Sequence, residues 1–119
     1  MLSQTIAEFC RHCGLPGLSM QEGGTLKLSI EGIGNFQMIH SSPKFLAGLQ
    51  RKIENPYLLT GQKILSHCHF REPHLKPLHA QIRNDVLGLS YIFKEEEITA
   101  ALLSSALDSL VDIMGRILQ

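Results

Sequence analysis

Two groups of cysteine and histidine residues in this sequence could support metal or redox chemistry. The stretch SHCHFREPHLKPLHA, residues 66–80, holds four of the six histidines and one of the three cysteines. Near the start, EFCRHCG separates Cys10 from Cys13 by two residues. A structural zinc ion needs about four such ligands, usually as two close pairs. Cys10 and Cys13 could form one pair, and the middle stretch offers candidates for the other: His67, Cys68 and His69.

The pattern around the first pair argues against this chemistry. Ser3 can cap a helix whose apolar stripe includes Cys10 and Cys13, and Gly14 followed by Pro16 ends that helix. A free cysteine on such a stripe packs as a small hydrophobic residue. A redox Cys-x-x-Cys motif follows a strand and opens a helix, whereas this one closes a helix. We therefore expect no enzyme, no cofactor and no metal, and keep a small zinc-binding or redox protein as the alternative.

The composition indicates a folded protein of ordinary type. With 119 residues, 44% of them hydrophobic and 18% charged, the chain is expected to form a single domain over residues 1–119. Its formal net charge of zero gives no overall attraction to nucleic acid or to anionic lipid. The first residues lack the pattern of a secretory signal. The number of cysteines is odd, and in a reducing compartment no disulfide framework is expected. We expect a cytoplasmic protein.

Alternating patterns predict two β-hairpins. TLKLSIEG and NFQMIHS are expected to be strands joined by a glycine-rich turn, because apolar and polar residues alternate with a period of two. LKPLHAQIR and VLGLSYIFK flank Asn84-Asp85, a pair suited to a two-residue hairpin turn. The segment KFLAGLQRKI fits either a strand or a helix from its local pattern alone.

Two further helices are expected. ENPYLLTGQKILSHCHF begins with Asn55 at a capping position and Pro56 in the first turn. The C-terminal segment EEEITAALLSSALDSLVDIMGRILQ begins with three glutamates that would complement the positive end of a helix dipole. Its apolar residues span an arc so wide that the helix must bury more than one side.

This order of elements, with FCRHCGLP closing the first helix and NDVLGLSYIF before the last, resembles the class I type III secretion chaperones of the Tir-chaperone and SycE kind. The resemblance implies an α+β fold in the order helix-strand-strand-strand-helix-strand-strand-helix, with an antiparallel sheet flanked by helices. It makes KFLAGLQRKI the third strand. Many members are acidic, whereas this chain is neutral, so it could be one subunit of a heterodimeric chaperone as readily as a homodimer.

The resemblance also implies a function. Such chaperones bind the N-terminal chaperone-binding segment of a secreted effector or gatekeeper protein in extended form and keep it soluble and secretion-competent. The implied effector-binding residues are Leu2, Ile6, Phe9, Leu28, Phe36 and Met38. The implied dimer-interface residues are Leu58, Leu65, His67, His69, Leu78, His79, Ala80 and Ile82. A generic dimeric adaptor remains a further alternative.

Overall fold

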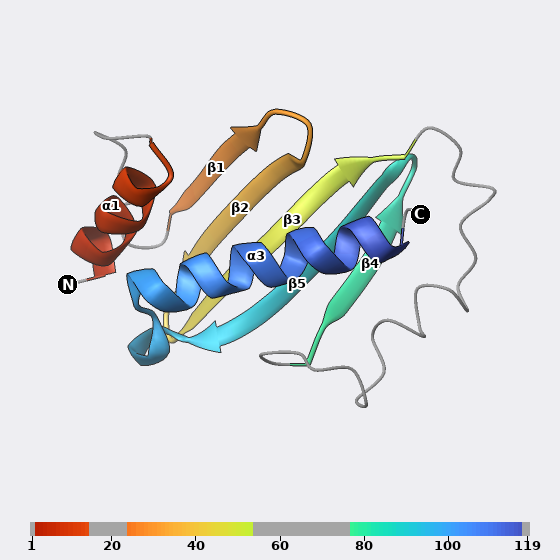
Figure 1. The fold of residues 1–119 in the computed structure, drawn as a ribbon. Helices are drawn as coiled ribbons and strands as arrows, with labels where there is room; N and C mark the ends of the chain where they lie inside the picture. The colour runs from red at the N-terminus through yellow and green to blue at the C-terminus, as the bar shows by residue number, and fades with distance from the viewer. Residues whose placement is uncertain (1, 15–23, 54–76, 118–119) are drawn as a thin grey trace.

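The computed structural model describes residues 2–14, 24–53 and 77–117 (Figure 1). In chain order its elements are α1 (Leu2–His12), β1 (Thr25–Ile30), β2 (Gly34–Ser41), β3 (Lys44–Lys52), β4 (His79–Arg83), β5 (Val86–Lys94), the 3₁₀ turn η2 (Glu95–Glu97) and α3 (Ala100–Ile117). The helix expected between Asn55 and His69 lies outside the described residues. The α+β fold class predicted from the sequence is confirmed.

The strands form one five-stranded antiparallel sheet in the order β1-β2-β3-β5-β4. The segment Lys44–Lys52, which was ambiguous from its local pattern, is therefore a central strand. Both predicted hairpins are present. Arg83 pairs with Val86, so Asn84 and Asp85 form the two-residue turn between β4 and β5. Asn84 adopts a φ of 57°, a conformation that asparagine tolerates better than most residues.

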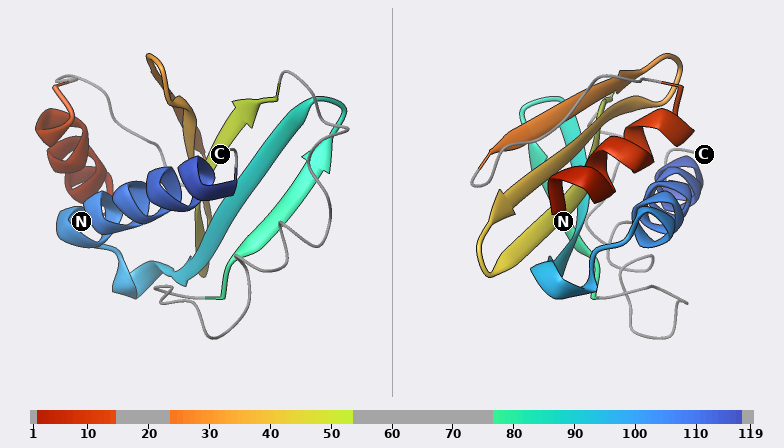
Figure 2. Two further views of the ribbon diagram at one scale, coloured as in Figure 1. Left: turned by 45° about the vertical axis from the view of Figure 1, so that its right-hand side comes forward. Right: turned by 90° about the vertical axis from the view of Figure 1, so that its left-hand side faces the viewer.

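Both described helices pack on one face of this sheet (Figure 2). Side chains that point to that face form the core, because alternate residues of a strand point to opposite sides. Phe9 of α1 contacts the Phe36 ring, with 5.7 Å between ring centroids. The hydroxyl groups of Tyr91 and Ser109 share a hydrogen bond of 2.7 Å, which joins β5 to α3. The sheet thus provides one buried face, and no described helix covers the other.

The ends of the two helices differ in how well the sequence predicts them. Gly14, at a φ of 79°, follows α1 as predicted, and its N–H donates to the Arg11 carbonyl. The helix begins at Leu2, however, so Ser3 lies within it and is not its cap. The prediction that the last helix begins at the three glutamates is wrong. α3 begins at Ala100, and the Thr99 hydroxyl caps it by accepting a bond from the Leu102 N–H.

Candidate functional site

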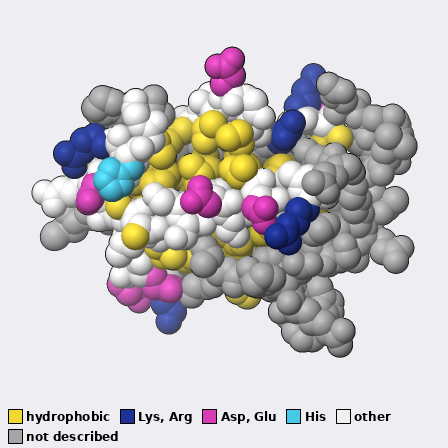
Figure 3. Space-filling view, in the orientation of Figure 1, with side chains coloured by type: hydrophobic (Ala, Val, Ile, Leu, Met, Phe, Trp, Pro, Cys, Tyr) yellow, Lys and Arg dark blue, Asp and Glu magenta, His cyan; other side chains and the backbone are white. Residues whose placement is uncertain are grey.

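An apolar groove lies between α3 and the β1–β2 hairpin. It encloses about 350 Å³, and its apolar lining comes from Ile30 and Ile33 of the hairpin and from Leu107 and Val111 of α3. The space-filling view shows a continuous hydrophobic surface over this region, with acidic side chains beside it (Figure 3). An exposed apolar hollow bordered by polar residues is typical of a surface that binds another protein.

The border of this groove is acidic. Asp108 and Asp112 lie on α3 among the groove residues, and both are exposed. Asp112 forms an ion pair of 3.0 Å with Arg116 one turn further along the helix. Within the groove lining itself, no basic side chain occurs among the described residues. The groove therefore favours an apolar partner segment that carries basic residues beside its apolar ones.

The groove continues into an edge of the sheet. β1 is an edge strand of the described sheet, because only β2 pairs with it. Leu26 and Ile30, which point to the helix-covered face, are only half-buried. An extended chain that paired with β1 would place alternate side chains beside these two residues, since cross-strand neighbours share a face. Strand addition at this edge would thus lead directly into the groove.

The residues that the sequence predicted to bind an effector occupy a different position. Leu28 is 3% exposed, and four others are at most 1% exposed: Ile6, Phe9, Phe36 and Met38. All five belong to the hydrophobic core rather than to the surface. Leu2 belongs to α1, but its side chain lies outside the described part. Their contact with a partner stays a prediction. Sequence reasoning missed the half-buried groove residues Ile33, Leu107 and Val111 as candidates.

The predicted dimer-interface residues lie partly on β4. In the described sheet β4 is the edge opposite β1. Ile82 is 41% exposed and Ala80 half-buried on the helix-covered face, His79 is exposed on the other face, and Leu78 is buried just before the strand. The remaining predicted residues fall outside the described part: Leu58, Leu65, His67 and His69. An edge strand with an exposed isoleucine suits subunit contact, and the interface stays a prediction.

A polar cluster ties the β2–β3 turn to the end of β5. His40 is buried on β2, and its Nε2 donates to Glu95 Oε2 at 2.7 Å. Ser42 Oγ donates to Glu95 Oε1 at 3.1 Å, and the Glu95 N–H donates to the Pro43 carbonyl at 3.0 Å. The hydrogen bonds from His40 and Ser42 lower the pKa of Glu95 below its usual value near 4.5, because they favour the ionised carboxylate. Glu95 thus positions the segment that leads into α3.

We expect this cluster to make stability depend on acid pH. A carboxylate with a lowered pKa in the folded state stabilises the protein above its unfolded pKa, and that contribution is lost as the pH falls through the folded value. Urea unfolding between pH 7 and pH 3 should show Glu95→Gln less stable than the parent at neutral pH. The difference should shrink below about pH 4.5. The same change at exposed Glu96 is the control, and a Glu95→Gln curve parallel to that of the parent would contradict the prediction.

The described residues give no support to the metal alternative. Cys10 is buried and Cys13 exposed at the end of α1, and no group of three or more potential metal ligands occurs among the residues that the structure describes. Burial raises the pKa of the Cys10 thiol, and partial desolvation together with the nearby Asp108 carboxylate raises that of Cys13, so the neutral forms are favoured over the thiolates that bind metal. The proposed second pair, which includes His67 and Cys68, lies outside the described residues.

Solved structures share this fold. SycH, a type III secretion chaperone of Yersinia pestis in complex with a fragment of YscM2, matches with a TM-score of 0.71 at 19% identity, over 98% of this chain and 99% of its own. The chain has the fold of the type III secretion chaperones. The structure of the HopA1–SchA chaperone–effector complex gives a TM-score of 0.72 at 11% identity, over 94% of this chain and 89% of the other.

The heterodimeric ExoU–SpcU complex of the Pseudomonas aeruginosa type III secretion system gives a TM-score of 0.54 at 20% identity, over 95% of this chain and 88% of the other. No protein-family model and no curated protein sequence matches the chain significantly. The resemblance to secretion chaperones that the order of elements implied is thus confirmed at the level of the fold. No helix in the described residues is long and apolar enough to cross a bilayer.

Proposed function

We propose that this protein is a type III secretion chaperone that binds the N-terminal segment of a secreted effector or gatekeeper protein in extended form. It acts by binding, without catalysis, and keeps that segment soluble and competent for secretion in the cytoplasm. The observation that carries the proposal is the apolar groove beside an edge strand, in a fold shared with chaperones whose structures were solved in complex with partner proteins.

The physical steps of binding follow from the groove and the edge strand. The partner segment adds a strand at the outer edge of β1, where main-chain hydrogen bonds provide sequence-independent affinity. Its inward side chains cover Leu26 and Ile30, and a large apolar side chain enters the groove between Ile33 and Val111. Basic residues near that side chain interact with Asp108. The opposite edge strand, β4, contributes Ile82 to the subunit interface of a homodimer or a heterodimer.

A charge placed in the groove tests the proposal. Val111→Glu would put a carboxylate beside Asp108 and Asp112, so an apolar side chain could enter only by stripping water from a charge. We expect at least a tenfold loss of affinity, equivalent to about 1.4 kcal/mol. Ser105→Glu adds the same charge to an exposed position of α3 and is the matched control.

The partner for this measurement is obtained from the native cell. Secreted proteins that co-purify with the tagged chain are identified by mass spectrometry, and a fragment of about 100 N-terminal residues is then produced for calorimetric titration. Both variants must keep the circular dichroism and melting temperature of the parent within a few degrees. Equal affinities for Val111→Glu and the parent would show that the partner segment does not bind in the groove. The absence of any secreted partner would overturn the proposed chaperone function.

A further inference from the structure

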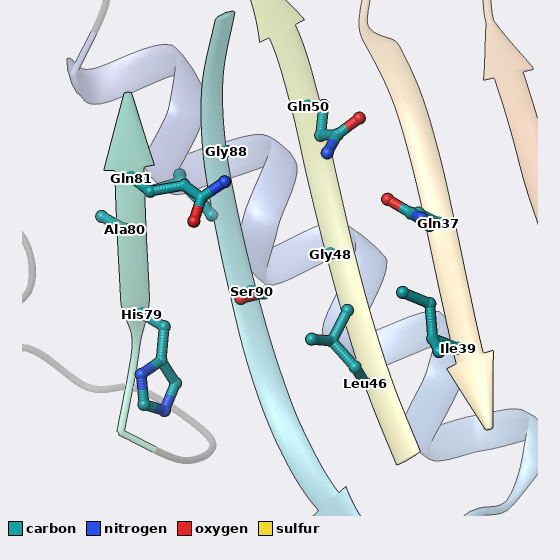
Figure 4. Close-up of a pocket in the computed structure, with 11 residues that line it drawn as sticks. Gln37, Ile39, Leu46, Gly48, Gln50, His79, Ala80, Gln81, Gly88 and Ser90 are labelled. Carbon is teal, nitrogen blue, oxygen red and sulfur yellow. The ribbon is translucent and has the colours of Figure 1, made fainter. Parts of the chain in front are cut away.

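The face of the sheet opposite α1 and α3 contains a second hollow, separate from the groove, which we call the trough. It encloses about 240 Å³ and crosses four strands, from β2 to β4. Gln37, Gln50 and Gln81 line one side of it, and Ile39, Leu46 and His79 line the other (Figure 4). Gly48, Gly88 and Ser90 form its floor, where small residues leave room above β3 and β5. Gly48 is buried at this floor, whereas Gly88 and Ser90 are half-buried.

The two glycines of the floor are present for different reasons. A Cβ on Gly48 would lie 3.1 Å from the Ser90 Cβ and 3.3 Å from the Leu89 carbonyl oxygen, so any larger residue there would force β5 to shift by a few tenths of an ångström. A Cβ on Gly88 would meet nothing closer than the Gln81 Cγ at 3.7 Å, which is an ordinary contact. Gly88 also has no positive φ. The fold itself therefore does not require glycine at position 88.

Glycine at position 88 lowers the stability of the sheet. β5 pairs with a neighbour on each side, and glycine in the interior of a strand is less stable than a β-branched residue by up to about 1 kcal/mol. A residue that breaks a local rule without a structural need is expected where function requires it. Gly88 leaves space in the trough, and that space is what an incoming side chain would occupy.

Charge identifies the kind of partner. The strand residues that point to this face include five basic residues and, among the described strands, no acidic residue. The basic residues are Lys27, Lys44, Lys52, Arg83 and Lys94. Lys44 and Lys94 are direct cross-strand neighbours, a pairing of like charges that destabilises a sheet unless an anion lies nearby. Of these five basic residues, only Lys52 has a carboxylate partner among the described residues, Asp85 at 3.5 Å.

We propose that the trough around Gly88 receives one large side chain of an acidic protein partner, whose Asp and Glu residues around that side chain meet the basic residues of this face. Leu46 and Ile39 contact the apolar part of the inserted side chain. The amides of Gln37, Gln50 and Gln81 accept or donate hydrogen bonds to its polar part or to the partner's backbone. This surface lies on the opposite side of the sheet from the groove, so the two partners can bind together.

Gly88→Val tests the proposal because it should change stability and binding in opposite directions. Valine favours a strand and fills the trough, so the melting temperature should rise by about 3–6 °C while binding at the trough falls at least tenfold. Ser29→Val makes a β-branched change at an exposed position of the same face, outside the trough, and should leave binding unchanged. The full chain is used throughout.

The probe is the capped peptide Glu-Asp-Trp-Asp-Glu, followed by ¹⁵N NMR titration at low salt. We expect saturable chemical-shift changes of the Gly48, Gly88 and Ser90 amides. The affinity should be at least fivefold lower for the basic peptide Lys-Arg-Trp-Arg-Lys and for Glu-Asp-Ala-Asp-Glu, which lacks the large side chain. It should fall by the same factor for the original peptide in 0.5 M NaCl. Val111→Glu should bind the probe as the parent does, which separates this proposal from that of the groove. No shifts at 5 mM peptide, equal binding of the basic peptide, or equal binding by Gly88→Val would overturn it.

Discussion

Gly34→Ala should destabilise the protein by about 3–5 kcal/mol, the largest effect that we expect from a single methyl group in this chain. Gly34 is the first residue of β2 and has a φ of 138°, a conformation that L-residues rarely adopt. A Cβ there would also collide with the backbone carbonyl oxygen of Gln50 on β3. Because that oxygen belongs to a paired central strand, relief of the clash would require β2 to separate from β3.

Gly32→Ala provides the matched comparison. Gly32 lies in the same turn with a φ of 77°, but no atom lies within 4 Å of the position that its Cβ would take. The change should therefore cost only the backbone strain, about 1–2 kcal/mol. Urea unfolding of the parent and both variants measures the two costs. Equal losses for Gly32→Ala and Gly34→Ala would mean that the contact with Gln50 contributes nothing.

The sequence predicted β1, β2 and β5 well because each alternates between a more buried and a more exposed face. β3 was ambiguous from its local pattern, because three buried residues follow one another in it. The β4–β5 turn was predictable from Asn84-Asp85 alone, since few residues tolerate the conformation that such a turn needs. The start of α3 was not predictable in this way. Three glutamates are a common first turn of a helix, but Glu95 is held by His40 from a strand fifty-five residues earlier. A contact of that separation leaves no local pattern.

The groove was less predictable than the fold. Alternation shows which face of a strand is apolar but not whether a helix covers it, so Leu28, Phe36 and Met38 could not be separated from surface residues by sequence. The wide apolar arc of the last helix was the available signal. Its buried residues face the sheet, and Leu107 and Val111 extend that arc beyond the area that the described strands cover. The excess apolar width of α3 thus forms one wall of the groove.

Phe9→Ala should reduce the free energy of unfolding by about 3–5 kcal/mol and separate α1 from the sheet. The Phe9 side chain is fully buried against Phe36, at an interplanar angle of 54°. α1 has only eleven residues, and an isolated helix of that length is marginal in water, so it depends on such packing. Glu8→Ala, at an exposed position of the same helix, should leave stability within about 0.5 kcal/mol.

The same variant decides between two roles for Phe9. If the ring is part of the core, hydrogen exchange of the α1 amides should accelerate in the free protein, in proportion to the loss of stability. If the ring moves out to contact a bound segment, the free protein should lose less than about 1 kcal/mol while affinity for the segment falls. The burial of Phe9 between α1 and β2 leads us to expect the first result. Substitution of a groove residue such as Val111 should instead give the second result, a small loss of stability with a fall in affinity, because these residues are already partly exposed before any partner binds.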